Sequence, residues 1–190
     1  MDCTSLQIFI ESIRSIWGPL TSAMVAGCRQ RLEELLKAPA TEEWLAALHR
    51  DAPASRELYR DLLHGFELLA DVEPAGLFRP PHDHGRGWVI YAIQHGEIEM
   101  GTYARTRGPD GKVQLVKRDA TLLSPGQAKV FLPGDIHDTR CITGPALLLR
   151  FTERDLKKED REARQVTRYV ERDSVWTDSA AARLTPAPLP

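Results

Sequence analysis

The spacing of apolar residues changes along the chain. In residues 6–17 apolar side chains recur every three or four positions, which predicts a helix with one buried face. A second helix is expected from Thr21 or Ser22 to about Lys37, and a third over 42–50, with Thr41 as its N-cap. After residue 55 the chain consists of short segments, either continuously apolar or alternating between apolar and polar residues, separated by turns that contain Gly and Pro. This is typical of strands.

The strands form a regular series. They are expected over 66–72, 88–93, 98–103, 113–116, 120–123, 128–132 and 146–151. His95-Gly96 predicts a chain-reversing turn, and Pro109-Asp110-Gly111 predicts a hairpin. Residues 57–63 fit either helix or strand, and the highly charged segment 152–164 predicts a solvated loop or helix face. The pattern predicts one mainly β domain with N-terminal helices (1–54), an antiparallel barrel or sandwich (55–176) and a loose C-terminal tail (177–190).

Candidate chemistry centres on Pro80-Pro81-His82-Asp83-His84. In a strand, residues two apart point to the same face, so His82 and His84 place two imidazoles side by side, with Asp83 facing away. A third histidine, His137, follows a Pro-Gly turn 53 residues after His84. Imidazoles are ligands for first-row transition metals, so the three histidines are the candidate metal ligands.

Charge and cysteine content narrow the class of protein. The 25 Lys and Arg residues nearly balance the 27 Asp and Glu residues, which gives no electrostatic reason to expect nucleic acid or an acidic membrane as a partner. Three cysteines without C-x-x-C spacing predict a reducing compartment. The N-terminus does not read as a signal peptide, because Asp2, Glu11 and Arg14 interrupt it. A cytoplasmic monomer or small homo-oligomer is expected.

The three histidines lie among glycines and prolines whose order along the chain matches a known pair of sequence motifs. Gly76, His82, His84 and Gly96, followed by Gly126, Pro133-Gly134 and His137, resemble the two signature motifs of the cupin superfamily. That resemblance implies a small jelly-roll barrel with a metal inside. The glutamate of the first motif is replaced by Val89, so the chain offers three histidines and no carboxylate ligand.

A three-histidine cupin preceded by helices resembles the cysteine dioxygenase family of thiol dioxygenases, over roughly residues 58–149. The resemblance implies Fe(II) held by His82, His84 and His137, and oxidation of a thiol to a sulfinate by O2. It also implies a substrate anchor. The segment Leu58-Tyr59-Arg60-Asp61-Leu62 resembles the one whose arginine binds the substrate carboxylate, if a short deletion precedes Phe66, so Arg60 is the expected anchor.

The chain departs from that family in one respect. The family's Ser-X-His-X-Tyr relay is missing from Leu147-Leu148-Leu149-Arg150-Phe151-Thr152, where Arg150 is instead a candidate second anchor for an acidic substrate. The cysteine that cross-links to the relay tyrosine in some family members corresponds to Val89, so no cross-link is expected.

Three functions follow from these residues. The first is an iron(II)-dependent dioxygenase for a small carboxylated thiol such as cysteine, 3-mercaptopropionate or mercaptosuccinate. The second is another three-histidine cupin dioxygenase that cleaves a C–C bond. The third is a non-catalytic cupin that binds a metal or a small ligand.

Overall fold

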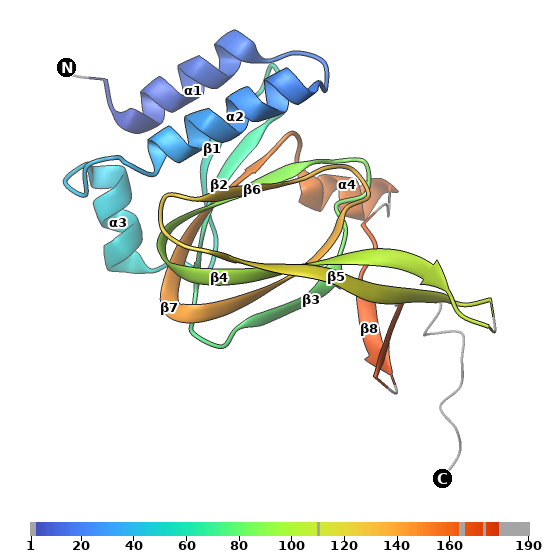
Figure 1. Ribbon diagram of the computed structural model, residues 1–190. Coiled ribbons are helices and arrows are strands. Elements are labelled where there is room, and N and C mark those ends of the chain that lie inside the picture. Colours follow the sequence, from blue (N-terminus) through green and yellow to red (C-terminus); the bar gives the residue numbers. More distant parts are fainter. Residues whose placement is uncertain (1–2, 110, 164–165, 173, 179–190) are drawn as a thin grey trace.

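Three helices precede the strands in the computed structural model, which describes residues 3–109, 111–163, 166–172 and 174–178. They are α1 (Ser5–Ile16), α2 (Ser22–Leu35) and α3 (Glu43–Asp51), and they lie together on one side of the sheet (Figure 1). The predicted helices are therefore present, with boundaries shifted by a few residues. None of the described helices is long and apolar enough to cross a membrane.

Side-chain hydrogen bonds cap the first turns of α1 and α2, whereas the N-cap predicted for α3 was wrong. Thr4 and Gln7 form a capping box at α1, and the Thr21 hydroxyl accepts a hydrogen bond from the Met24 amide at α2. The N-cap of α3 is Glu42, so the prediction of Thr41 was wrong. Glu42 caps no amide of its own helix. Its carboxylate instead accepts hydrogen bonds from the amide and hydroxyl of Ser5 and so joins α3 to the start of α1.

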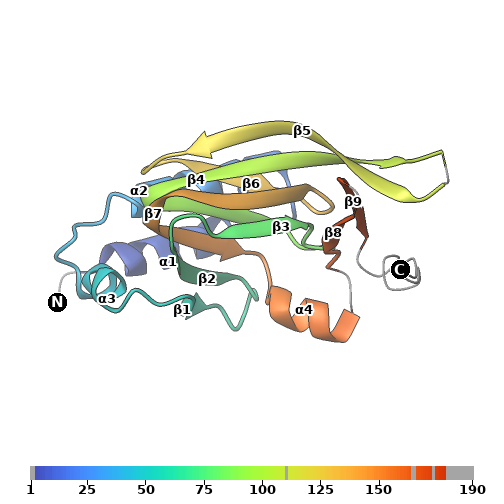
Figure 2. The same ribbon diagram turned by 90° about the horizontal axis from the view of Figure 1, so that it is seen from below.

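In the described part of the chain nine strands follow, with one further helix between the seventh and the eighth. The bounds are β1 (Arg56–Arg60), β2 (Glu67–Glu73), β3 (Phe78–His82), β4 (Val89–Arg107), β5 (Val113–Leu123), β6 (Ala128–Phe131), β7 (Ile136–Thr152), α4 (Leu156–Ala163), β8 (Tyr169–Arg172) and β9 (Val175–Asp178). The first seven form one antiparallel sheet in the order β1-β2-β7-β4-β5, with β3 on β7 and β6 on β4. The first half of β7 pairs with β3 and its second half with β2, so the sheet curves around an interior (Figure 2). The predicted mainly β barrel with N-terminal helices is confirmed.

The central strands are longer than the apolar runs indicated. β4 continues through His95-Gly96 with shifts of register, so the predicted chain reversal there was wrong. Gly96 forms a bulge instead. Its φ is +75°, and a Cβ at this position would lie 2.6 Å from the Thr143 carbonyl oxygen, so only glycine fits. The strands predicted at 113–116 and 120–123 are likewise one strand, β5.

The C-terminal part differs from its prediction at two places. Within the charged segment 152–164, residues 156–163 form α4. Thr177 and Asp178, which were expected in the loose tail, belong to β9. Residues 179–190 lie outside the described part of the chain.

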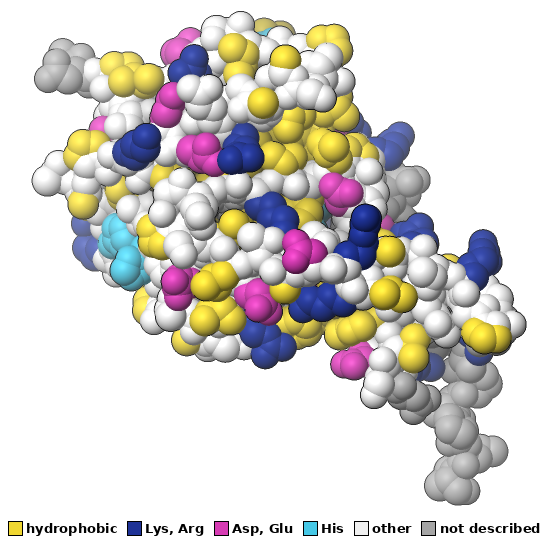
Figure 3. Space-filling model, in the orientation of Figure 1, with side chains coloured by type: hydrophobic (Ala, Val, Ile, Leu, Met, Phe, Trp, Pro, Cys, Tyr) yellow, Lys and Arg dark blue, Asp and Glu magenta, His cyan; other side chains and the backbone are white. Residues whose placement is uncertain are grey.

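Alternation along the strands divides the sheet into two faces. Leu147, Leu149 and Phe151 of β7 pack with Phe9 and Ile13 of α1 in the core beneath the helices. Leu148 lies on the opposite face with Tyr91, Ile98 and Met100, inside the barrel. Arg150 is two residues from Leu148, so it shares this interior face. The space-filling view shows charges of both signs interspersed over the face that it presents (Figure 3).

Asp61 closes the turn between β1 and β2 and ties it to α1. Its carboxylate accepts hydrogen bonds from Arg14 Nε at 2.7 Å, from the Tyr59 hydroxyl at 3.1 Å and from the amides of Leu63 and His64. Burial acts to raise the pKa of Asp61, but these donors prevail and lower it from 3.8 to about 2.

The low pKa of Asp61 makes this turn acid-sensitive. Since the folded pKa lies below the unfolded one, the ionised carboxylate stabilises the fold fully above about pH 4 and progressively less as the pH falls toward 2. We expect Asp61→Asn to lower the free energy of unfolding by about 2 kcal/mol at pH 7 and by far less at pH 2. Urea unfolding of both proteins across this range checks it, and a difference that does not change with pH would contradict it.

Candidate metal centre

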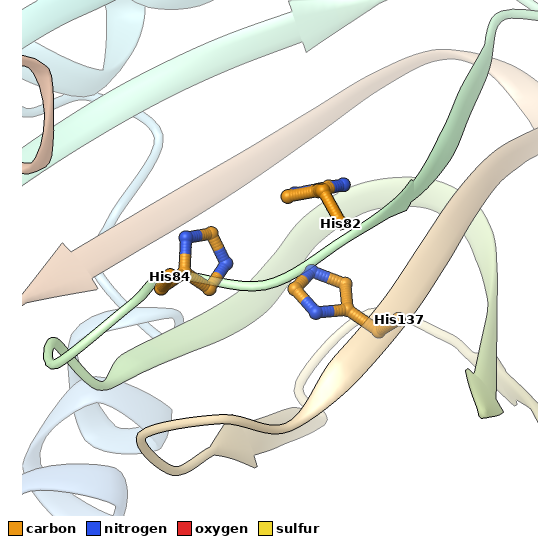
Figure 4. Close-up of side chains that lie close together, drawn as sticks. All are labelled: His82, His84 and His137. Carbon is orange, nitrogen blue, oxygen red and sulfur yellow. The ribbon is translucent and has the colours of Figure 1, made fainter. Parts of the chain in front are cut away.

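His82, His84 and His137 come from two adjacent segments of the barrel. His82 is the last residue of β3, His84 lies in the loop that follows, and His137 is the second residue of β7. His82 and His137 are direct partners in the β3–β7 ladder, which places their side chains next to each other. Figure 4 shows the three rings gathered around a common space.

The geometry allows the three rings to share one ion. Their ligand nitrogens all lie within 4.8 Å of one another, and the ring centroids are 4.6–5.1 Å apart. His137 is fully buried, and neither of its ring nitrogens has a hydrogen-bond partner among the described residues. A buried imidazole without a partner is costly, and coordination of a metal removes that cost. The residues present therefore fit a metal ion held by three imidazoles.

Burial keeps these imidazoles neutral. It lowers the pKa of all three histidines, and repulsion from His82 adds to the effect at the other two. The pKa of His84 falls to about 3, with Arg150 as a further cause. Neutral imidazole is the form that binds metals, so no proton has to leave these rings near neutral pH.

Neighbouring side chains fix the rings in place. Phe131 of β6 stacks on His137 with centroids 3.8 Å apart and planes 15° from parallel. His82 Nδ1 lies 2.9 Å from the Pro80 carbonyl oxygen, which orients its ring and leaves Nε2 for a ligand role. The Tyr91 hydroxyl lies 3.4 Å from His84 Nε2.

Asp83, between two of the histidines, holds their loop. Its carboxylate accepts hydrogen bonds from the amides of Gly85 and Thr167 and forms an ion pair with Arg105 at 3.3 Å. The loop that carries the histidines is thereby tied to the C-terminal segment that precedes β8.

A cavity of about 880 Å³ opens beside the histidines. Its wall includes His82 and His84, the apolar side chains of Met100 and Leu148, and the polar side chains of Tyr91 and Arg150. A space of this size accommodates a small molecule next to a metal ion, and its mixed lining is typical of ligand sites.

Arg150 reaches this cavity from β7. Its side chain is 24% exposed, and its Nε lies 3.3 Å from the Asp71 carboxylate of β2. Tyr91 is its direct partner on β4. Arg150, the predicted second anchor, thus lies in the same cavity as two of the three histidines.

Arg60 lies elsewhere. Its guanidinium forms ion pairs with Glu57 at 2.8 Å, Glu67 at 2.6 Å and Asp155 at 2.9 Å. It lines a second, smaller cavity, which Arg150 also lines but the histidines do not. These three carboxylates occupy the donors that a substrate would need, so the structure does not bring Arg60 together with the histidines. Its anchor role stays a prediction that this arrangement does not support.

Several polar residues of the cavity were not predicted from the sequence, among them Asp71, Glu73, Tyr91 and Thr139. Tyr91 stands in an apolar run and was interpreted as core, although its hydroxyl faces His84. The available signal was on β2, where two carboxylates alternate with apolar residues on a strand that is largely buried. Val89, at the position of the cupin glutamate, is buried in the apolar interior.

Comparison with known proteins gives only distant structural likenesses. No protein-family model and no curated protein sequence matches the chain. KdgF from Halomonas sp. is 19% identical with a TM-score of 0.40, over 52% of this chain and 74% of its own. The cupin domain of Cnp3 from Schizosaccharomyces pombe is 17% identical with a TM-score of 0.41, over 56% and 64%. An oxalate oxidase in complex with glycolate is 18% identical with a TM-score of 0.37, over 52% and 50%. At these values the likenesses support no conclusion about activity or substrate.

Proposed function

We propose that the protein is an iron(II)-dependent dioxygenase that oxidises a small carboxylated thiol to a sulfinate. The observation that carries the proposal is a cluster of three neutral imidazoles, two of them buried, beside a cavity that also contains a largely buried arginine. In this reaction both atoms of O2 are added to sulfur. A thiolate R–S⁻ and O2 give R–SO2⁻, so that sulfur loses four electrons and O2 gains them.

His82, His84 and His137 would hold the iron. When bound, a ferrous ion with three neutral ligands keeps its full positive charge, which favours the thiolate form of a substrate and leaves open positions for the thiolate and O2.

The rest of the chain would position the substrate. Arg150 offers a guanidinium that can bind a carboxylate with two parallel hydrogen bonds. Ile98, Met100 and Leu148 line the cavity and limit access of water to its apolar side. Tyr91, between His84 and Arg150, places a hydroxyl where it can donate a hydrogen bond to the substrate.

Oxygen uptake tests this proposal directly. The protein reconstituted with iron(II) is assayed with cysteine, 3-mercaptopropionate and mercaptosuccinate, and the product mass is recorded. We expect oxygen consumption with at least one thiol and a product that contains two additional oxygen atoms. Stoichiometric iron without oxygen uptake on any thiol would overturn the proposal.

A second candidate is a dioxygenase that cleaves a C–C bond in a β-diketone or a related enol. The observation that favours it is the second half of β7, where residues 147–152 provide neither the histidine nor the tyrosine of a thiol dioxygenase relay. Oxygen uptake with a β-dicarbonyl compound, and none with thiols, would select this function.

A further inference from the structure

Asp83 lies between two candidate metal ligands, and its carboxylate is bonded to other parts of the chain. The side chain is 4% exposed, and one of its oxygens accepts hydrogen bonds from the amides of Gly85 at 3.0 Å and Thr167 at 2.9 Å. The Asp83 amide donates in turn to the Thr167 carbonyl oxygen at 3.0 Å. Asp83 therefore joins the loop that carries the histidines to residues 166–172, which we call the wall segment.

Two further contacts join the wall segment to this loop. The backbone of His82 pairs with that of Arg168 in an isolated antiparallel bridge, so a candidate metal ligand and Asp83 meet consecutive residues of the segment. Arg105 of β4 contacts both sides of the junction. Its guanidinium lies 3.3 Å from the Asp83 carboxylate, and its Nε donates to the Tyr169 hydroxyl at 3.1 Å. The loop and the wall segment cannot move apart without breaking these contacts.

The wall segment also borders the histidine cavity, which Val166, Arg168, Tyr169 and Val170 help to line. Its strand β8 pairs with β9 in a two-stranded sheet separate from the seven-stranded sheet. Figure 2 shows both strands at the end of the barrel beside β3. Because the main sheet does not include it, the wall segment is held against the barrel by individual contacts, and elements held in this way open more readily than a central strand.

We propose that Asp83 is a positioning residue that couples metal binding by the three histidines to closure of the cavity by the wall segment. A metal ion holds the rings of His82 and His84 in one arrangement and so fixes the loop between them. The fixed loop presents Asp83 to the wall segment, and the cavity is complete when the metal is bound. Such coupling is reciprocal, so a closed wall segment also raises the affinity for the metal. This inference requires the metal centre but not dioxygenase activity.

Hydrogen–deuterium exchange of the full chain tests the coupling, with iron(II) alone as the added ligand and under nitrogen. We expect amide exchange in the wall segment to slow about 10-fold or more when free iron(II) is about 100-fold above its Kd. The amides of Leu63 and His64, which also donate to a buried carboxylate, are the internal reference. Their exchange should change by less than about 2-fold, because their turn does not contact the histidine loop.

Asp83→Ala should uncouple the wall segment from the metal. We expect the iron-dependent slowing to fall below about 3-fold and the Kd for iron(II) to rise about 10- to 100-fold, the usual effect of losing a group that orients metal ligands. Asp83→Asn keeps an oxygen that accepts the amide hydrogen bonds, so it should retain more of both effects. Arg105→Met should weaken both in the same direction, which keeps the test valid if Asp83→Ala does not fold.

Asp61→Ala is the matched control. Asp61 is a buried carboxylate that also accepts hydrogen bonds from two amides and an arginine, but in the turn between β1 and β2. Its loss should lower the stability of the fold while the Kd for iron(II) and the iron-dependent slowing stay at their wild-type values. A merely structural role for Asp83 would give the same result in Asp83→Ala.

Three outcomes would each overturn the coupling. They are a wild type that does not bind iron(II), a wild-type wall segment whose exchange iron(II) does not slow, and a slowing that persists in both Asp83→Ala and Arg105→Met. If iron(II) slows exchange as expected but no thiol consumes oxygen, the coupling stands and the dioxygenase proposal falls.

Discussion

His137→Ala is expected to abolish metal binding and, with it, oxygen uptake. Iron should fall from about one ion per chain to less than a tenth, because two remaining imidazoles bind a divalent ion far more weakly than three. His137 is the ligand with the fewest alternative roles, since neither ring nitrogen bonds to another described residue. Iron is measured by plasma mass spectrometry after reconstitution and desalting.

The control for this variant is His49→Ala, because His49 is an exposed histidine at the end of α3. It should retain full iron content and full activity. Circular dichroism should show that both variants keep the sheet. Full iron occupancy in His137→Ala would contradict the assignment of the three histidines as one metal site, whatever the activity.

Arg150→Met is expected to weaken binding of carboxylated thiols about 10- to 100-fold, the usual effect of losing charge-assisted hydrogen bonds in a buried site. The iron content should stay at the wild-type level, because Arg150 is not one of the three candidate metal ligands. The measurement is calorimetry under nitrogen with 3-mercaptopropionate and with ethanethiol, which lacks the carboxylate. Only the affinity for the carboxylated thiol should fall.

The substitution also leaves Asp71 without its ion pair, which could destabilise the protein independently of binding. The double variant Arg150→Met with Asp71→Asn removes this unpaired charge and should restore the thermal midpoint without restoring affinity. Recovery of affinity in the double variant would show that Asp71, and not the lost guanidinium, weakened binding. Unchanged affinity in Arg150→Met would exclude the anchor role.

Local pattern was enough to predict several features of this chain. Apolar residues recur every three or four positions in the helices and every second position in the strands. These spacings distinguish the two, because each reflects which side chains share a face within a single element. The same rule predicted that His82 and His84 belong together, and the Pro-Gly turn added His137. The three do cluster, although β3 ends at His82 and His84 lies in the following loop. Thr21 as the N-cap of α2 was equally local, because the hydroxyl bonds an amide three residues away.

Long-range pairing decided the rest. His95-Gly96 resembles a turn in sequence, but Thr143 and Ala146 of β7 crowd against Gly96 and make it a bulge in a continuous strand. Arg60 has the chemistry of a carboxylate anchor, yet Glu67 and Asp155 already occupy its guanidinium, the latter from 95 residues away. Conversely, no sequence motif marks Tyr91, Glu73 or Thr139, although all three line the cavity.

The sequence by itself determined which residue types are available and which side of a strand each one faces. Only the tertiary structure decided which strands meet across the barrel, and therefore which charges neutralise one another and which buried polar atoms remain without partners. Among the described residues, such atoms occur on His137, Glu73, Thr139 and Arg150 at the candidate site, and also on Glu67, Trp88 and Gln94 outside it. A hydrogen-bond partner is a property of three-dimensional packing, so its absence cannot be read from the order of residues.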